Sequence, residues 1–95
     1  MPNEPHTHNF AGVTSLEDGH VHRYSGITSY EPDYPGHIHY MAGFTTFEDG
    51  HVHEYRLMTG PAIYVEGGHY HHYKGITMVA DGHIHNMEGN TSLYG

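Results

Sequence analysis

The fold follows from one short phrase, Gly19-His20-Val21-His22-Arg23-Tyr24-Ser25-Gly26-Ile27-Thr28, which recurs six times within 95 residues. Each copy carries a His-x-His pair, then an aromatic residue or Met two places on, then Gly and Thr. Pro5 replaces the leading Gly of the first copy, and Leu57 replaces the inner Gly of the fourth. The chain is therefore an internal tandem repeat.

The His-x-His pairs begin at positions 6, 20, 37, 51, 69 and 83, so a constant short spacing alternates with a longer one. Because the spacing alternates, the natural unit is two copies, and the chain holds three such units. We expect a single domain spanning residues 1–95, built from hairpin units at about 6–36, 37–68 and 69–95.

The connections between copies indicate strands rather than helices. Acid-glycine turn signals occur at Asp18-Gly19, Asp49-Gly50 and Asp81-Gly82, and a Gly or Pro every few residues disfavours helix. The predicted fold is all-β, an antiparallel meander of six short strands. Two forms stay open: a small barrel, or an open sheet that pairs with copies of itself.

Alternation along the strands predicts which face is buried. In the quoted copy His20, His22 and Tyr24 share one face, and Arg23 lies on the other. In all copies the His face carries no formal charge, so we expect it to point inward. The strand Gly could mark a bulge, so the prediction covers the His-x-His-x-aromatic half only.

The paired histidines are the candidate metal ligands. Residues i and i+2 project from one strand face about 6.5–7 Å apart, so two imidazoles can lean onto one ion. In a meander, odd and even strands begin at opposite ends, and each end then collects six imidazoles, enough for one or two three-coordinate sites. Imidazole ligands favour copper or zinc first, with nickel as a further candidate. The predicted ligands are His6, His8, His20, His22, His37, His39, His51, His53, His69, His71, His83 and His85.

Composition excludes several other classes of function. The chain has three Lys and Arg and eleven Asp and Glu, so it lacks the basic surface that nucleic-acid binding requires. No cysteine is present, which rules out disulfides and thiolate sites, and no apolar run approaches the ~20 residues of a membrane span. The N-terminal residues lack the features of a Sec signal peptide, so we expect cytoplasmic synthesis, with assembly on a spore or cell surface left open.

Three hypotheses of function remain. The first is a metal-binding structural protein that self-assembles into an oligomer, filament or tube, since the few apolar residues make a stable monomer doubtful. The second is a metal buffer or storage protein. The third is a metal-dependent β-barrel enzyme, which we disfavour because catalysis needs one differentiated site, not six repeated ones. A non-metal alternative is that the imidazoles only pack and hydrogen-bond.

Three stretches carry a resemblance to a known family: Asp49-Gly50-His51-Val52-His53-Glu54-Tyr55, then Thr59-Gly60-Pro61-Ala62-Ile63, then residues 67–77 with their Gly-His-Tyr-His-His phrase. They resemble the YmaF family, small His-rich proteins of spore-forming and related bacteria. The same order of residue types recurs from His6 to Thr91, so the resemblance covers nearly the whole chain. It implies a bacterial origin and a repeat architecture, without an activity to carry over.

Overall fold

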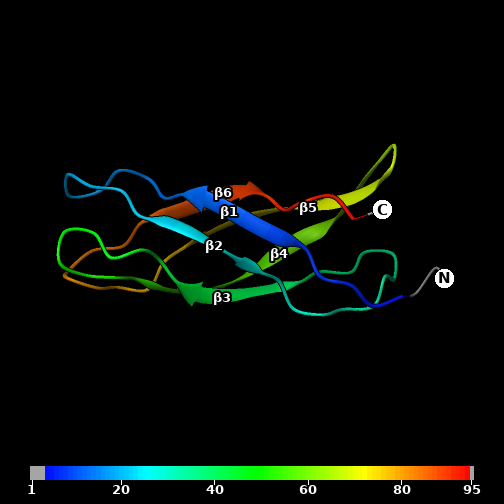
Figure 1. Ribbon diagram of the computed structural model, residues 1–95, viewed down its shortest axis with the longest axis horizontal. Helices are drawn as coiled ribbons and strands as arrows, with labels where there is room; N and C mark the ends of the chain where they lie inside the picture. Colours follow the sequence, from blue (N-terminus) through cyan, green and yellow to red (C-terminus); the bar gives the residue numbers. More distant parts are fainter. Residues whose placement is uncertain (1–3, 95) are drawn as a thin grey trace.

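The computed structural model describes residues 4–94, and all regular structure in this part is β-strand (Figure 1). The strands run along the long axis of an elongated molecule measuring 46 × 20 × 17 Å. They are β1 (Asn9–Val13), β2 (Arg23–Ile27), β3 (Tyr40–Phe44), β4 (Glu54–Val65), β5 (Gly68–Ile76) and β6 (Asn86–Asn90). The predicted all-β class and the six antiparallel strands are confirmed.

The strands form two sheets: β1 pairs with β2, and the second sheet has the order β3-β4-β5-β6. Within residues 4–94 the strands do not close into a barrel, so that form of the predicted fold is not found. The sheets nevertheless touch at both sides through main-chain hydrogen bonds of 2.8–2.9 Å. These run from Ser29 N to Tyr40 O, Thr46 N to Arg23 O, Ser15 N to Asn86 O and Ser92 N to Asn9 O.

The three acid-glycine turns gather at one end of the molecule, at the left in Figure 1. In the first turn Asp18 and Gly19 have φ values of 53° and 83°, and Glu17 and His20 exchange main-chain hydrogen bonds of 3.1 Å. Positive φ at both central residues defines a type I′ turn, whose twist matches that of the flanking strands. The turns at 49–50 and 81–82 repeat this geometry, which explains why the short spacing between histidine pairs is the same in all three units.

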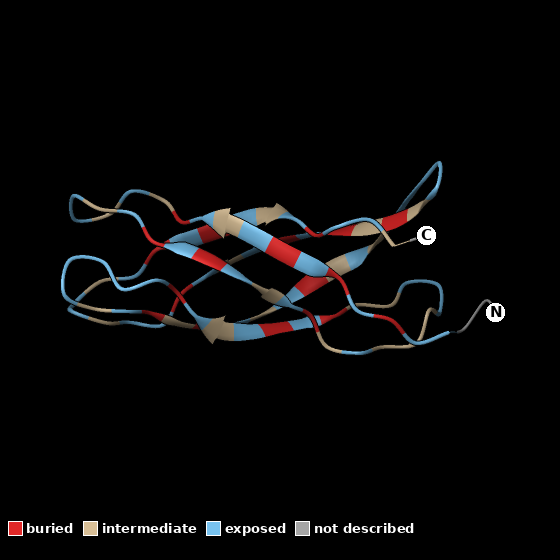
Figure 2. Cartoon of the chain, viewed as in Figure 1, coloured by how far each residue is buried: buried red, intermediate tan, exposed pale blue. Residues whose placement is uncertain are grey.

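The alternation of buried and exposed residues extends further than the sequence predicted. Both sheets turn the same repeat positions inward, and the red and pale blue bands in Figure 2 follow this period of two. The strand Gly does not break it, because the Thr two places later is also buried, with 2–7% of its surface exposed. The inward positions are therefore His, His, aromatic or Met, Gly and Thr in turn.

A small apolar core fills the middle of the molecule, and the inner Gly residues make room for it. Gly26 lies opposite Phe10 in the β1–β2 register, and a Cβ at Gly26 would stand 2.8 Å from the tip of the Phe10 ring. In the fourth copy Leu57 instead faces Met41, where a thinner side chain leaves space. The core consists of Phe10, Tyr24, Met41, Tyr55, Tyr73 and Met87, with Leu57 packed against it.

The division into hairpin units at 6–36, 37–68 and 69–95 stays a prediction. The strand pairing does not follow the boundary between the second and third units. β4 and β5 pair with each other across it, from Ala62 to Val65, beyond the repeat phrase. A register shift between Thr59 and Ala62 accommodates Pro61, which lacks the N–H of a ladder residue. The second half of the fourth strand is thus formed despite Leu57, with this one irregularity in its register.

We predict that Gly26→Ala destabilises the protein by about 1–3 kcal/mol, because the added methyl group must displace the buried Phe10 ring. Denaturant unfolding of the variant and the parent protein measures the difference. Gly60→Ala is the matched control, since its Cβ would meet nothing closer than 3.5 Å. Equal losses in both variants would contradict the packing role assigned to Gly26.

Candidate metal centres

The structure gathers all twelve paired histidines into two clusters, one at each end of the molecule. The turn-end cluster consists of His20, His22, His51, His53, His83 and His85. The terminus-end cluster consists of His6, His8, His37, His39, His69 and His71. His72, the thirteenth histidine, lies outside both clusters, exposed beside Asn90 and Glu88. The predicted separation of odd and even pairs to opposite ends is what the fold produces.

The six imidazoles of each cluster are arranged as an octahedron. In the turn-end cluster every ring packs against four others with centroids 4.7–5.0 Å apart, and lies opposite the fifth. The same pattern holds in the terminus-end cluster at 4.6–5.3 Å. The sequence predicted three-coordinate sets, because it could not show that all three hairpins contribute both histidines of a pair.

The Nε2 atoms of neighbouring rings point toward a common centre. Their separations are 3.0–3.3 Å, as between His22 and His51 or between His6 and His69. An octahedron with such edges has its centre about 2.1–2.3 Å from each vertex, close to a metal–imidazole bond length. In each cluster five ligand atoms lie within 4.8 Å of one another. His69 and His83 are the sixth histidines of the two clusters and are not members of these groups of five.

Main-chain carbonyl groups fix the tautomer of the second histidine of each pair, which we call the inner histidine. Nδ1 lies 2.8–2.9 Å from a carbonyl oxygen in all six, so Nδ1 carries the proton and donates it. The Nε2 atom is then left with a lone pair only. The six bonds join His8 to Ser92, His22 to Thr46, His39 to Ser29, His53 to Met78, His71 to Gly60 and His85 to Ser15.

Each repeat threonine positions two of these imidazoles at once. Thr14 Oγ1 accepts the main-chain N–H of His22 at 3.0 Å, and donates to the carbonyl of Ser15 at 3.1 Å. The same hydroxyl lies 3.3 Å from Nδ1 of His85, which itself donates to the Ser15 carbonyl. Thr14 therefore links His22 of one hairpin to His85 of another, and each of the other five threonines links two histidines in the same way.

The first histidine of a pair, the outer histidine, also uses Nδ1 as its donor where a main-chain carbonyl lies within reach. His20, His51 and His83 approach the carbonyl oxygen two residues earlier at 3.1–3.3 Å. At the other end His37 reaches the Tyr34 carbonyl at 2.7 Å. In these four rings Nε2 again faces the centre with its lone pair.

Converging lone pairs leave the interior of each cluster electron-rich. Two Nε2 atoms that both lack a proton cannot hydrogen-bond to each other, so their close approach needs a positive charge at the centre. The Nε2 atoms of His8, His39 and His85 are buried without a hydrogen-bond partner among the described residues. Leaving a buried acceptor unmatched costs about 1–3 kcal/mol. A cation at the centre of each cluster removes that cost for these rings, and the donor set therefore fits a metal ion.

Burial also keeps these imidazoles neutral. Burial, with a smaller contribution from the positive charge of neighbouring histidines, lowers the pKa of His8 and of His71 to about 4. The pKa values of His39 and His85 move in the same direction for the same reason. A neutral imidazole is the form that binds a metal, so the fold prepares the ligands for it.

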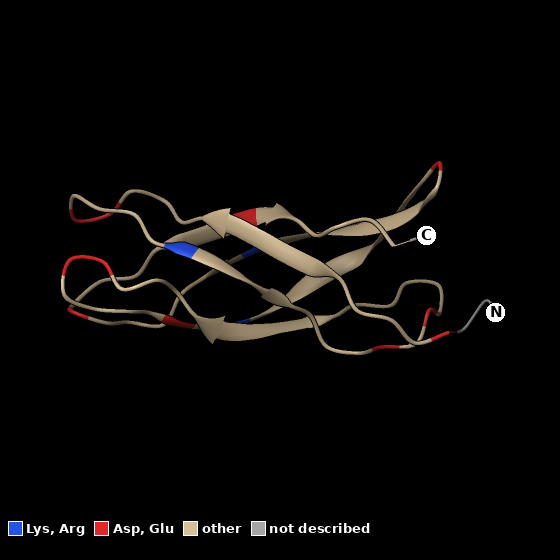
Figure 3. Cartoon of the chain, viewed as in Figure 1, with Lys and Arg blue, Asp and Glu red and all other residues tan. Residues whose placement is uncertain are grey.

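The carboxylates beside the outer histidines were not expected from the sequence. It predicts turns at Asp18, Asp49 and Asp81, and the structure also places each of these side chains near an imidazole of another hairpin. Figure 3 shows these acidic groups at the three turns. The signal was present in the sequence, since an Asp-Gly turn precedes His20, His51 and His83 in the same way, but the partner across the hairpins could not be inferred from it.

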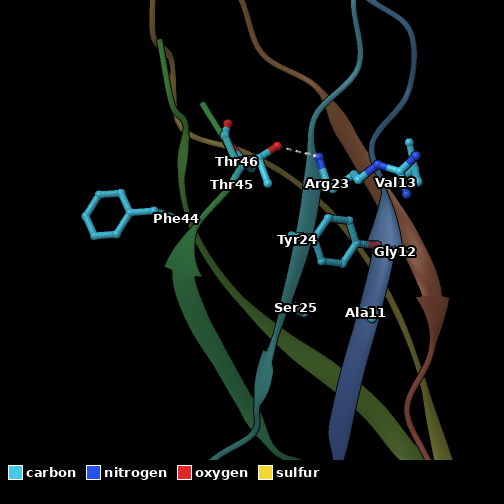
Figure 4. A pocket seen from close by; sticks show the side chains of 9 residues that line it. All are labelled: Ala11, Gly12, Val13, Arg23, Tyr24, Ser25, Phe44, Thr45 and Thr46. Atoms are coloured by element: carbon cyan, nitrogen blue, oxygen red, sulfur yellow. Dashed lines mark hydrogen bonds between the residues drawn. The ribbon is translucent and has the colours of Figure 1, made fainter. Parts of the chain in front are cut away.

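A surface hollow of about 550 Å³ is separate from both clusters. It lies beside β1, β2 and the end of β3, next to Tyr24, Phe44 and Thr45 (Figure 4). Arg23 is its one charged lining residue, and the main-chain N–H of Arg23 bonds to Thr46 Oγ1 at its rim. With no histidine or carboxylate in its lining, this hollow carries no catalytic constellation.

We predict that the metal-free protein loses stability as the pH falls from about 6.5 to 4. The folded-state pKa of His8 and His71 lies below the unfolded value of 6.5, so the unfolded chain takes up protons that the folded chain excludes. Their contribution is fully present above pH 6.5 and disappears toward pH 4. Denaturant unfolding after treatment with a chelator, at pH 7.5, 6, 5 and 4, measures it. A free energy of unfolding that stays constant over this range would refute the expected burial of neutral imidazoles.

Comparison with known proteins yields one match. The model of the YmaF family, described as spore germination protein GerY/YamF, matches residues 3–93. No curated protein and no solved structure matches the chain significantly. The described residues include no helix of the length and apolar character needed to cross a membrane. Because the match spans nearly the entire repeat, the chain belongs to the YmaF family.

Proposed function

We propose that this protein binds two divalent transition-metal ions, one in each histidine cluster, with six imidazole nitrogens around each ion. The observation that carries the proposal is the convergence of Nε2 lone pairs, 3.1–3.2 Å apart, in rings whose Nδ1 protons are already used. Packing alone does not explain it, because imidazoles that only fill space would turn N–H groups toward neighbouring acceptors.

The shape of the ligand set favours ions that accept six nitrogen donors. Zinc in structural sites is almost always tetrahedral, and copper(II) prefers a tetragonal arrangement. Nickel(II), cobalt(II) and iron(II) combine imidazole affinity with octahedral coordination, and calcium and magnesium prefer oxygen. We therefore place nickel, cobalt and iron before the copper and zinc that a three-histidine set would favour.

Full coordination favours holding the ion over catalysis. A catalytic metal keeps a position open for water or substrate, whereas six imidazoles fill every position. Each ion would join all three hairpins, and binding to the folded state alone raises stability by mass action. We accordingly propose a structural role, with metal storage as the alternative that fast exchange would favour, and no enzymatic step.

Self-association is the second part of the proposal, and the outer surface supports it. Unpaired strand edges contribute little, since β2 approaches β3 and β1 approaches β6 at the sides of the two sheets. Large apolar side chains, however, recur on the outside at one repeat position, with about half or more of their surface exposed. These are Val13, Ile27, Phe44, Met58 and Ile76. We propose these recurring exposed side chains as contact points with a second copy of the chain, which offers the matching repeat.

We predict that the metal-free protein takes up two nickel(II) ions per chain at pH 7.5. His22→Asn and His39→Asn should each reduce the stoichiometry to one, because each removes one Nε2 while an amide can still donate to the carbonyl that Nδ1 serves. His72→Asn is the control and should keep two. Calorimetric titration with elemental analysis of the product measures the stoichiometry. The triple variant His72→Asn/His22→Asn/His39→Asn tests the proposal as a whole. If the parent protein binds none of nickel, cobalt, iron, zinc and copper more tightly than this variant does, the proposed function is wrong.

We also predict oligomers larger than the 10.7 kDa chain at micromolar concentration. Phe44→Ser and Ile27→Ser together should shift the distribution toward monomer, because both side chains are 65% exposed and apolar. Light scattering with chelator and with added nickel measures the mass. A monomer under both conditions would rule out self-assembly while leaving the metal sites untouched.

A further inference from the structure

The turn-end cluster is surrounded by a closed ring of carboxylates. Each of the three aspartates lies in a type I′ turn, with φ of 52–53°, and directs its carboxylate to an outer histidine of a different hairpin. The Nδ1–Oδ2 distances are 3.3 Å for His20 and Asp49, 3.6 Å for His51 and Asp81, and 3.7 Å for His83 and Asp18. Each aspartate also offers its own carbonyl oxygen to the histidine of its own hairpin. The ring therefore connects all three hairpins.

The terminus-end cluster has no such ring in the part of the chain that the structure describes. Asp33 is the one carboxylate paired with a ring nitrogen of these six histidines in residues 4–94, at 3.6 Å from Nδ1 of His37. His69 has no acceptor within hydrogen-bond distance of Nδ1 in this part of the chain, and the separation of 5.3 Å between the His69 and His71 rings is the widest in the cluster. The Oδ1 atom of Asp33 is buried and has no hydrogen-bond partner in residues 4–94. Asp33, His6, His37 and His69 together form a further group of side chains whose ligand atoms lie close enough to hold one metal ion.

Carboxylates behind ligating imidazoles change how a metal is held. A negative charge beside the Nδ1–H of a ligating imidazole raises the basicity of Nε2 and helps to hold the ring, and losing such a partner typically reduces metal affinity about 10- to 100-fold. Three carboxylates also offset the charge of the ion. At the other end, the carboxylate of Asp33, 3.6 Å from Nδ1 of His37, gives a departing ion an alternative ligand.

We infer that the two clusters are unequal metal sites, a slow site at the turn end and an exchanging site at the terminus end, with Asp18, Asp49 and Asp81 as the positioning residues that make the difference. This inference rests on the proposed metal binding. It assigns retention to the turn-end ion and exchange with the surroundings to the other, so one chain can keep its fold while it gives up or takes on metal.

The first experiment uses the full chain loaded with two nickel ions and challenged with excess EDTA. We expect two phases of release of equal amplitude, with rates at least about tenfold apart. His39→Asn should retain the slow phase alone and His22→Asn the fast phase alone. A single phase for the parent protein, or the slow phase in His22→Asn, would overturn the inference.

The second experiment tests the carboxylates. Asp18→Asn/Asp49→Asn/Asp81→Asn preserves the turns, because Asn adopts positive φ as readily as Asp, and removes only the charge. We expect the slow phase to quicken about tenfold or more and the nickel absorption bands of the turn-end site to shift, which a merely structural role would not cause. Asp33→Asn is the control for the same charge at the other end and should leave the slow phase unchanged. An unchanged slow phase and unchanged bands in the triple variant would refute the role of the ring.

Absence of metal binding and equality of the two sites give different experimental results. If the parent protein binds no ion, the proposed function is wrong and no release is seen. If it binds two ions that leave at the same rate, the proposed function stands and the inequality of the sites is wrong. Thermal unfolding of each variant after metal removal shows whether a change in release reflects the fold instead.

Discussion

The structure depends on one hydrogen bond, repeated six times: the Nδ1–H of an inner histidine donates to the carbonyl oxygen of the residue that follows a repeat threonine. This bond does three things. It satisfies a buried polar group, it joins neighbouring hairpins, and it turns the Nε2 lone pair toward the centre of the cluster. Without it, an imidazole in this position could adopt either tautomer, and the interior would lose both its register and the convergence of its Nε2 lone pairs.

The same bond explains how a chain with so small an apolar core holds its shape. Six buried apolar side chains in the middle, flanked by two histidine clusters, leave much of the interior polar. Buried polar networks are stabilising only when their members are satisfied. The threonine hydroxyls and the carbonyls satisfy the Nδ1 side of the inner rings, and only the Nε2 side is left open. The converging Nε2 lone pairs are the part of the interior that the proposed metal ions would satisfy.

The sequence was sufficient for the local structure and for the division of the histidines between two ends. Strand period, Asp-Gly turns and the absence of charge beside the histidines are local signals, and they predicted six antiparallel strands with the imidazoles inside. The octahedral grouping was not predictable from them. It depends on how three hairpins are placed around one axis, which is set by contacts such as that of Thr14 with His85, far apart in the sequence. The strand Gly was also ambiguous, since its partner, the ring of Phe10 or Tyr24, is visible only once the register is known.

The difference between the two ends of the molecule arises from the links between the strands. All three turn-end links have the same length and the same Asp-Gly pair, whereas the other two links differ from each other in both length and sequence. Turn length governs where the aspartate carboxylate lies, so a ring that must reach from each hairpin to another tolerates no variation. The longer links carry no such constraint, and one of them places Asp33 beside His37 while the other extends β4 and β5. Uniformity at one end and divergence at the other are what two metal sites with different duties would require of a repeat protein.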